Sequence, residues 1–524
     1  MEKDRPLNQR ARSIGASAWP ATALVTLLVA APVVVLAARS VRGGDIVEVW
    51  SRPGVLDAVR FSIVIGLTST LVTLVVAAGP TIVIGRRRFR GRAAALAVLT
   101  APFVLPTVVV GAAFLALLPD RFDRTVWAVL AAHAFFNASV VIRQVVPLLE
   151  SVPEELIEAA RTLGAAPVRA WTSVAWPIVR PAVASAAGLV FLLSATSFGV
   201  VRILGGPSRA TIDVEIHRRA VLLGDLSGAT ILAVAQTLAV ATAVSIAARR
   251  RRPAVRLRHS ATVVTLPTAG RAARLVIVAS ITVVVAPLVA LVASSMRVGG
   301  DWSLAGWRML IGLEPLGGPS ALRIDVADAL VRSLAVAAGA VLLATPLGLG
   351  AAVAATRDSR WRVVSMVPAA VSAIVVGFGI IVTYDRGFLD WRGSWWLVPA
   401  VHASVALPFV TRVVEPLVAA LPRGPEEAAA TLGADPWTTW RLVRLPLLRP
   451  AISTAAAFSA ALSLGEFGAT AFLARTDSRT LPVLVDLLVG RSGERPFAAA
   501  MAASTLLFVI TFALVLGVDR RRST

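Results

Sequence analysis

Twelve apolar stretches, each about 20 residues long, recur along this chain of 524 residues. A helix needs about 20 mostly apolar residues to cross the hydrocarbon core of a bilayer. The pattern therefore predicts an all-α polytopic membrane protein with about twelve transmembrane helices. We expect the spans at residues 19–38, 62–85, 94–118, 127–146, 182–204, 228–248, 273–295, 333–356, 363–384, 396–415, 451–474 and 497–517.

The charged residues fit a membrane protein better than a soluble or nucleic-acid-binding one. Only 16% of the residues are charged, whereas a soluble domain usually has about a quarter. The net charge of +22 comes almost entirely from arginine, because Lys3 is the one lysine. These arginines lie between apolar segments and form no single basic face, so we expect a lipid bilayer around the chain and no nucleic-acid partner.

Thiol and metal chemistry have little support in the sequence. The chain has no cysteine, which excludes disulfides, thiolate metal sites and cysteine nucleophiles. Its four histidines, His133, His217, His259 and His402, are too scattered to form a metal motif. We therefore expect no metal and no cofactor. We expect His133 and His402 to pack or hydrogen-bond between helices.

Arginine-rich loops alternate with loops of mixed charge, which indicates an orientation. Cytoplasmic loops of membrane proteins carry an excess of Lys and Arg. If the N-terminus is inside, three arginine-rich loops and the C-terminal tail also fall inside: 86–92, 249–258, 357–362 and 520–522. The outside loops mix both signs, as between Asp120 and Arg124. We therefore expect an even number of spans and both termini in the cytoplasm.

One segment of the chain occurs twice. Residues 153–181 align with residues 422–450 at a constant offset of 269, without a gap. Fourteen of these 29 positions are identical: Pro153, Glu158, Ala159, Ala160, Thr162, Leu163, Gly164, Ala165, Pro167, Trp171, Val174, Pro177, Arg180 and Pro181. Alanine richness alone does not produce this shared register of Glu, Gly, Trp and Pro. The repeat predicts two parallel six-helix halves, 1–255 and 256–524, related by an axis along the membrane normal.

Each copy of the repeat lies in an inside loop and is typical of a helix, a turn and a second short helix. Pro153 and the two glutamates after it predict a helix start, because proline suits the first turn and acids favour the positive end of the helix dipole. Gly164 predicts the helix end in a left-handed conformation, and Pro167 predicts the turn. We expect Pro177 and Pro181 to separate the second helix from the next membrane span.

The repeated residues resemble the EAA loops of permeases from binding-protein-dependent ABC importers. In that family the loop holds a coupling helix that sits in a cleft of the ATPase subunit. The resemblance implies coupling roles for eight residues: Glu158, Ala159, Ala160 and Gly164 in the first loop (about 150–181), and Glu427, Ala428, Ala429 and Gly433 in the second (about 419–450). Two such loops on one chain are similar to the fused permeases of thiamine and ferric-iron importers in the plasma membrane of bacteria. The second loop departs from the pattern at its start, where Arg423 stands at the position of Glu154.

We do not expect this chain to be an enzyme or to hydrolyse ATP. A P-loop needs a lysine at the nucleotide phosphates, and Lys3 lies in the N-terminal tail with no Gly-rich loop before it. The resemblance therefore implies separate ATP-binding subunits, in two copies with one on each loop. It also implies an extracytoplasmic substrate-binding protein.

Glu466 is a candidate for the transport pathway. Ionisable residues inside a span are costly and usually face a cavity or the protein interior, and Glu466 falls within the span expected at 451–474. Its repeat equivalent is Ser197, and each is followed by a phenylalanine, Phe467 or Phe198. The resemblance implies that these helices line the path, so we expect all four side chains there. A helix cap or a local ion pair is the alternative for Glu466.

The sequence leaves alternatives open for both the substrate and the class of transporter. Segments 204–216 and 477–482 look most like a thiamine permease, so thiamine is the first candidate and ferric iron the second. An ion-coupled secondary transporter also has twelve spans and two repeats, but it does not need paired EAA loops. A channel would carry a filter-like motif or a charged ring, and a polytopic enzyme would carry a clustered acid, histidine or metal site. The sequence shows neither pattern.

Overall fold

The structure is a computed structural model that describes residues 18–42, 46–249, 270–314, 326–385, 391, 393–422, 424–475 and 478–523. Several expectations fall outside these residues: the N-terminal tail with Lys3, most of the loop 249–258, the boundary at 255 and 256, Arg423 and part of segment 477–482. Regular structure in the described part is helical except for one short pair of strands, β1 (Arg297–Val298) and β2 (Asp301–Trp302). The all-α fold predicted from the sequence is confirmed.

The described residues contain ten to twelve candidate membrane spans, in line with the expected number of about twelve. Ten helices in this part of the chain are long and apolar enough to cross a membrane: Ala18–Val41, Val55–Arg86, Val126–Glu150, Pro167–Ala195, Leu226–Ile246, Arg271–Ser294, Val326–Ala355, Leu397–Ala420, Pro436–Gly465 and Glu494–Leu514. Two bent pairs of shorter helices are apolar and long enough when each pair is taken together, which gives up to twelve spans if each pair is one span. Apolar side chains stay exposed on outward faces, as in helices surrounded by lipid: Leu71 is 65% and Leu342 74% exposed.

The third span of each half is bent, whereas the sequence predicted straight helices at 94–118 and 363–384. The bent pairs are α5 (Arg92–Thr100) and η2 (Ala101–Val104) with α6 (Thr107–Leu117), and α17 (Ser359–Met366) and η6 (Val367–Ala370) with α18 (Ala373–Thr383). The bends are 107° and 90°. Pro106 lies directly before α6 and Pro368 lies inside η6. Because proline lacks an N–H and disturbs the preceding turn, it ends the helix at these places.

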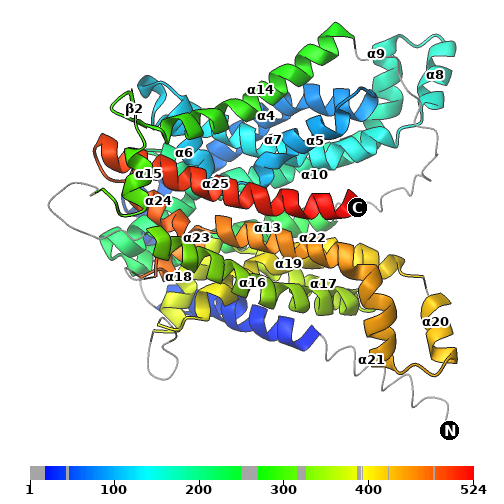
Figure 1. Ribbon diagram of the computed structural model, residues 1–524. Coiled ribbons are helices and arrows are strands. Elements are labelled where there is room, and N and C mark those ends of the chain that lie inside the picture. Colours follow the sequence, from blue (N-terminus) through cyan, green and yellow to red (C-terminus); the bar gives the residue numbers. More distant parts are fainter. Residues whose placement is uncertain are drawn as a thin grey trace. The chain divides into compact units, whose positions relative to one another are not determined.

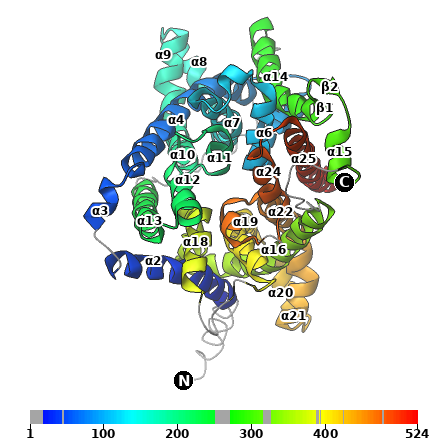
Figure 2. The same cartoon turned by 90° about the vertical axis from the view of Figure 1, so that its left-hand side faces the viewer.

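The first compact unit comprises Trp50–Glu215 and Ala239–Leu304. Its centre is a bundle of α4 (Val55–Arg86), α7 (Val126–Glu150) and α10 (Trp176–Ala195), which pack on one another (Figure 2). The other elements are α5, η2, α6, η3 (Asp120–Phe122), α8 (Glu154–Thr162), α9 (Pro167–Ala170), η4 (Trp171–Ala175), α11 (Gly199–Leu204), most of α12 (Ile212–His217), the end of α13 (Leu226–Arg249) and α14 (Arg271–Ser294). Val141, Leu149 and Val179 are buried in its core.

The second compact unit comprises Met1–Val49, Ile216–Leu238 and Ala305–Thr524. Its centre is the equivalent bundle of α16 (Val326–Ala355), α19 (Leu397–Ala420) and α22 (Leu445–Gly465) (Figure 1). The other elements are η1 (Thr26–Ala30), α2 (Ala31–Arg42), α3 (Ile46–Ser51), η5 (Arg218–Leu223), the start of α13, α15 (Ala305–Leu310), α17, η6, α18, α20 (Gly424–Thr431), α21 (Pro436–Thr439), η8 (Trp440–Arg444), α23 (Gly468–Leu473), α24 (Leu481–Val489) and α25 (Glu494–Ser523).

Each unit includes the first span of the other half of the sequence. α14 packs against α4, α5 and α6 in the first unit, and α2 packs against α18 in the second. Glycine permits the second of these contacts, because a Cβ atom on Gly379 would lie 2.9 Å from the Cβ of Pro32. The compact units therefore differ from the halves of the sequence repeat. The repeat alone did not predict this exchange.

Candidate functional site

The first hairpin, residues 154–175, is built as the sequence predicts. Its first helix, α8, begins directly after Pro153 and has two glutamates in its first turn. Gly164 then takes a φ of +85°, and Ala165 donates its N–H to the carbonyl of Ala160 at 3.0 Å. This is the left-handed helix end that glycine favours. The predicted helix, its start and its end are confirmed.

The second hairpin, residues 424–444, has the same backbone at its turn. Gly433 takes a φ of +82°, and Ala434 donates its N–H to the carbonyl of Ala429 at 3.0 Å. In the described part of the chain, no atom beyond the chain neighbours lies within 4 Å of a Cβ built on Gly164 or Gly433. Glycine is therefore favoured at both turns by the positive φ angle and not by lack of space for a side chain.

The second helix of each hairpin runs without a break into the next membrane span. Continuous helices extend over Pro167–Ala195 and Pro436–Gly465, so the separation expected at Pro177 and Pro181 is wrong. A π-helical turn, η4 or η8, precedes the first proline in each copy. A π turn shifts the hydrogen-bond pattern by one residue, which lets the proline enter the helix without a break. Each hairpin is thus continuous with a membrane span.

The predicted coupling residues have equivalent environments in the two hairpins. The glutamates, the first alanine of each motif and the glycines are exposed: Glu158, Ala159, Gly164, Glu427, Ala428 and Gly433. The second alanines, Ala160 and Ala429, are half-buried, and Ala160 packs against the core of the first unit. Each motif therefore offers one exposed face to a partner and turns its second alanine inward.

The sequence analysis missed an apolar tip on each hairpin. Leu163 is 88% and Val168 76% exposed, and at the equivalent positions Leu432 is 87% and Trp437 67% exposed. Paired apolar side chains that stay exposed on a polar surface are typical of an interaction site. The available signal was a leucine kept directly before the glycine in both copies.

An apolar contact holds the first hairpin against its unit. Ile157 of α8 is 8% exposed and Ala175 of η4 is fully buried, and both belong to the core that also contains Leu149 and Val179. Burial of such a side chain stabilises by about 1.5–3 kcal/mol. The inner face of the first hairpin is therefore part of the hydrophobic core.

An arginine from the second span adds a polar clamp to the first hairpin. Arg86, the last residue of α4, donates to the carbonyls of Leu149 at 3.4 Å and Val152 at 3.1 Å. It also forms an ion pair with Glu154 in the first turn of α8. One guanidinium thus ties together the end of α4, the end of α7 and the start of the hairpin.

An ion pair takes the place of the apolar contact in the second hairpin. Glu426 and Arg444 stand at the positions of Ile157 and Ala175, and the two guanidinium nitrogens Nε and Nη2 bond the two carboxylate oxygens. Both side chains are half-buried, and α20 buries none of its residues. The same backbone is therefore anchored by different chemistry.

Asp435 caps the second helix of the second hairpin. Its carboxylate accepts the N–H of Thr438 at 2.6 Å. Hydrogen bonds from the side chain and backbone of Thr438 lower the pKa of Asp435 from its ordinary value of 3.8. The first hairpin has Ala166 at this position and no side-chain cap.

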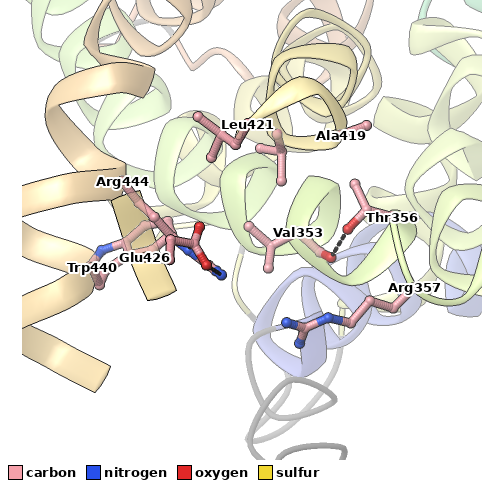
Figure 3. A pocket seen from close by; sticks show the side chains of 9 residues that line it. Val353, Thr356, Arg357, Ala419, Leu421, Glu426, Trp440 and Arg444 are labelled. Atoms are coloured by element: carbon pink, nitrogen blue, oxygen red, sulfur yellow. Dashed lines mark hydrogen bonds and ion pairs between the residues drawn. The ribbon is translucent and has the colours of Figure 1, made fainter. Parts of the chain in front are cut away.

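A cavity of about 260 Å³ lies beside the second hairpin (Figure 3). Its lining comes from the end of α16, the end of α19 and the hairpin itself: Val353, Thr356, Arg357, Val418, Ala419, Leu421, Glu426, Trp440 and Arg444. Figure 3 shows Arg357 across the cavity from the pair of Glu426 and Arg444. The walls are thus a mixture of apolar side chains and charged groups.

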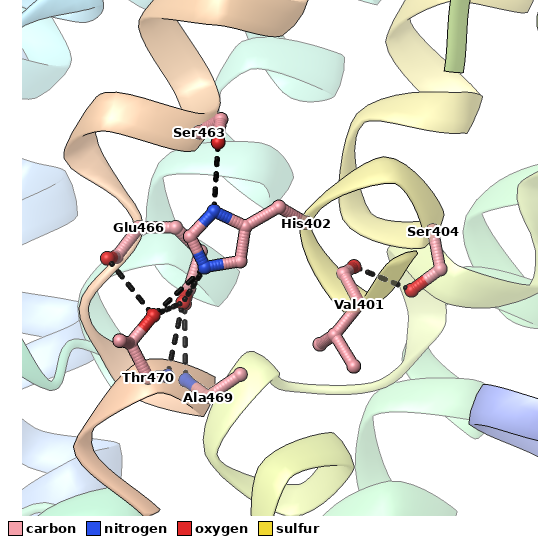
Figure 4. A network of polar contacts seen from close by, with 7 residues as sticks. All are labelled: Val401, His402, Ser404, Ser463, Glu466, Ala469 and Thr470. Carbon is pink, nitrogen blue, oxygen red and sulfur yellow. Dashed lines mark hydrogen bonds and ion pairs between the residues drawn. The ribbon is translucent and has the colours of Figure 1, made fainter. Parts of the chain in front are cut away.

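Glu466 lies at a break in the fifth span of the second half. α22 ends at Gly465 and α23 begins at Gly468, so the single helix predicted at 451–474 is wrong. The carboxylate of Glu466 accepts the N–H of Ala469 at 3.1 Å and that of Thr470 at 3.2 Å (Figure 4). Glu466 therefore caps α23, which is the local role that the sequence left open as an alternative.

His402 completes a buried polar network with this glutamate (Figure 4). Its Nδ1 lies 2.7 Å from the hydroxyl of Ser463, and its Nε2 lies 2.8 Å from the hydroxyl of Thr470. The same Nε2 lies 3.4 Å from the carboxylate of Glu466. The network joins α19 to both sides of the helix break.

The first half has the same break with different side chains. α10 ends at Ala195 and α11 begins at Gly199, and the carbonyl of Ser197 accepts the hydroxyl of Thr211 at 2.8 Å. The Nδ1 atom of His133 lies 2.9 Å from the hydroxyl of Ser69, whereas the equivalent His402 lies beside the carboxylate of Glu466. Ser197, Phe198 and Phe467 are all buried. Within the described ranges, no group of three His, Asp or Glu side chains is placed to hold a metal ion.

Comparison with known proteins decides the family. The family described as "Binding-protein-dependent transport system inner membrane component" matches the chain twice, over residues 76–257 and 344–524. The two matches cover more than half of the chain, and each contains one hairpin. The chain belongs to this family. It is a multi-pass ABC importer permease of the inner membrane with two fused repeats, as the EAA loops implied.

Relatives of this permease are named for the transport of more than one solute. It is 25% identical over 512 residues to the thiamine transport system permease protein ThiP of Escherichia coli, which covers 90% of each chain. ThiP of Brucella suis is 29% identical over 415 residues, 77% of this chain and 72% of ThiP. A permease protein whose name assigns it to 2-aminoethylphosphonate transport, PhnV of Salmonella typhimurium, is 34% identical over 198 residues, 37% of this chain and 74% of PhnV.

Membership of the permease family narrows the partners and the class of transporter. Transport in this family depends on a binding protein, so a substrate-binding protein and an ATPase are the general partners of such a permease. The alternative of an ion-coupled secondary transporter is therefore set aside.

Proposed function

We propose that this permease imports thiamine, which an extracytoplasmic binding protein delivers to the membrane-spanning bundle. The observation that supports this most is the length of the match to ThiP, which covers 90% of both chains and includes both repeats. The PhnV match covers 37% of this chain. 2-Aminoethylphosphonate is therefore the second candidate, and ferric iron is the third because the fused arrangement alone supports it.

We further propose that two copies of a separate ATPase dock on the cytoplasmic side, one on each hairpin. Two hairpins with the same turn and equivalent exposed tips on one chain support this number. The proposal places both termini in the cytoplasm, since the arginine-rich loops and both hairpins then share one side. The proposed transport path is lined by Glu466, Ser197, Phe198 and Phe467.

Uptake measurements test the substrate. Cells that lack only this permease are compared with cells that carry it, using labelled thiamine, labelled 2-aminoethylphosphonate and labelled ferric iron. We expect loss of thiamine uptake alone. Loss of phosphonate or iron uptake with normal thiamine uptake would replace the first candidate by the second or third.

Purification tests the docking sites. Glu158→Ala and Glu427→Ala each remove an exposed carboxylate from one motif without touching the core. We expect each single variant to retain less ATPase on purification, and the double variant to retain the least. Full retention of the ATPase by the double variant, together with normal uptake, would contradict the proposed docking role.

Glu466→Gln tests the pathway. Glutamine keeps the size of the side chain and one carbonyl acceptor for the N–H groups of α23, but it removes the negative charge. If the charge attracts a cationic substrate, uptake falls while the amount of protein in the membrane stays the same. Uptake at the level of the unmodified permease would leave Glu466 with its capping role alone.

A further inference from the structure

The arginine clamp of the first hairpin has an equivalent residue in the second half. Ser62 of α4 accepts the N–H of Ile212 at 2.9 Å, and Ser333 of α16 accepts the N–H of Leu481 at 2.8 Å. These matching bonds align α4 with α16 at an offset of 271. At this offset, Arg86 corresponds to Arg357.

The same register holds near the ends of the two helices. Ala77 of α4 belongs to the core cluster that contains Val141. Gly348, 271 residues after Ala77, packs so closely on Val410, 269 residues after Val141, that a Cβ on Gly348 would lie 2.3 Å from Val410. Both arginines lie nine residues beyond this contact, Arg86 as the last residue of α4 and Arg357 two residues after the end of α16 at Ala355.

The cavity in Figure 3 is lined by the equivalents of residues that Arg86 bonds in the first unit. Arg86 donates to the carbonyls of Leu149 and Val152, and their equivalents at the end of α19, Val418 and Leu421, line the cavity. Arg357 lines it from the other side. A water molecule occupies about 30 Å³ in the liquid, so a cavity of about 260 Å³ is large enough for a guanidinium group.

The chemistry of the cavity suits a guanidinium group. Val418 and Leu421 lie at the C-terminal end of α19, where the carbonyls carry partial negative charge. The carbonyl of Val418 accepts the N–H of Leu421 at 3.4 Å, and the equivalent carbonyl of Leu149 accepts both the N–H of Val152 at 3.4 Å and Arg86. Glu426 adds a carboxylate on the side of the hairpin. An arginine presents five N–H donors in a fixed plane and can bond carbonyls and a carboxylate together.

We infer that Arg357 is a positioning residue of the second coupling hairpin, and that its guanidinium enters this cavity to bond the carbonyls of Val418 and Leu421 and the carboxylate of Glu426. This inference rests on the proposed docking of an ATPase on the hairpin. In Figure 3 Arg357 lies across the cavity from Glu426, and in this inference closure of the ATPase onto the hairpin moves its guanidinium into the cavity. Arg86 already makes these contacts in the first hairpin, so the movement would change the second hairpin alone.

Cysteine labelling measures whether the cavity closes. The chain has no cysteine, so a single Thr356→Cys variant puts one thiol on the cavity wall. The permease is purified with its ATPase and treated with a small maleimide, first without nucleotide and then with ATP and vanadate. We expect labelling of Thr356→Cys to slow several-fold with ATP and vanadate, and we expect this protection to disappear when Arg357→Ala is added.

Matched variants separate this inference from the proposed function. Arg360→Ala removes an exposed arginine three residues away and should leave the nucleotide-dependent protection of Thr356→Cys intact. Arg357→Lys should retain part of the protection that Arg357→Ala loses. Thr431→Cys on the exposed side of α20 reports docking itself, because a bound ATPase shields it. If Thr431→Cys is shielded but Thr356→Cys labels equally with and without nucleotide, the clamp is wrong and the docking stands. If the ATPase shields neither thiol, the docking is wrong as well.

Discussion

The two hairpins share one backbone but are anchored by opposite kinds of contact. In the first, Ile157 and Ala175 are both buried in the core of their unit. In the second, Glu426 and Arg444 occupy the same positions as a half-buried ion pair. The turn glycines have φ angles of +85° and +82°. Backbone signals thus determine the shape of each hairpin, while the contact behind it can change from apolar to ionic.

This difference predicts unequal stiffness. An apolar contact depends little on salt and pH, whereas an exposed or half-buried ion pair is weakened by screening and is worth at most about 1 kcal/mol in most cases. The cavity beside the second hairpin adds to the difference, because it removes packing partners from that side. We therefore expect the first hairpin to be the fixed one and the second to be the movable one.

The largest expected effect comes from removing the buried side chain of Ile157 from the apolar contact of the first hairpin. Ile157→Ala should cost about 2–5 kcal/mol, the usual range for removing a buried isoleucine side chain, whereas Glu426→Ala should cost about 1 kcal/mol or less. Trypsin cleavage at Arg161 and Arg441, which are exposed on the respective hairpins, measures local opening in each. Cleavage at Arg161 should accelerate far more in Ile157→Ala than cleavage at Arg441 does in Glu426→Ala. Equal acceleration would remove the contrast between the anchors.

Substitution of the turn glycines, Gly164 and Gly433, should weaken ATPase binding equally in the two hairpins. Gly164→Val and Gly433→Val each force a β-branched residue into the left-handed region, which costs about 1–2 kcal/mol for an L-residue and lowers ATPase binding by about tenfold per 1.4 kcal/mol. Retention of the ATPase on purification measures both. Gly424→Ala is the matched control, because that glycine lies in α20 with open space around its Cβ position and no positive φ. A large loss in one valine variant only would show that the turns are not equivalent.

High salt should distinguish the hairpins by a smaller amount. The Debye length falls from about 10 Å at 0.1 M to about 3 Å at 1 M salt, so the pair of Glu426 and Arg444 loses part of its contribution of about 1 kcal/mol or less. Trypsin cleavage at Arg441 should then accelerate modestly at 1 M salt while cleavage at Arg161 keeps its rate. Arg444→Ala should abolish the salt effect at Arg441. A salt response of the same size at both sites would contradict an ionic anchor specific to the second hairpin.

Much of this architecture was predictable because its signals are local in sequence. Apolar length gave twelve spans, and Pro153 with Gly164 gave the limits of α8. The prediction failed at Pro177, where a π turn lets the helix continue. The prediction failed again in the third span of each half, where a straight helix was expected but the helix is bent near a proline. Both failures concern how a helix accommodates proline, which depends on neighbouring helices.

The anchors could not be predicted because they join residues distant in sequence. Arg86 and Val152 are 66 positions apart, and nothing in the 269-residue repeat indicates that α4 and α16 align at 271. From the sequence, Glu466 was predicted to lie inside a span. A role in lining the transport path was favoured over a role as a helix cap or in a local ion pair. The cap became visible only when the break at Glu466 brought its carboxylate to the N–H groups of Ala469 and Thr470. Its role in the path stays a proposal.

The smallest expected effect concerns pH and the cap at Asp435. Hydrogen bonds from Thr438 lower the pKa of Asp435 below its ordinary value of 3.8, so the ionised form is favoured in the folded hairpin. The contribution of the cap is therefore fully present above pH 3.8 and is lost as the pH falls through the lowered value. Hydrogen exchange of the amides after Asp435, corrected for the intrinsic effect of pH, should lose protection on acidification, whereas the amides after Ala166 should not. Asp435→Asn keeps a good N-cap without a titrating group and should remove the pH dependence; if it persists in this variant, another group causes it.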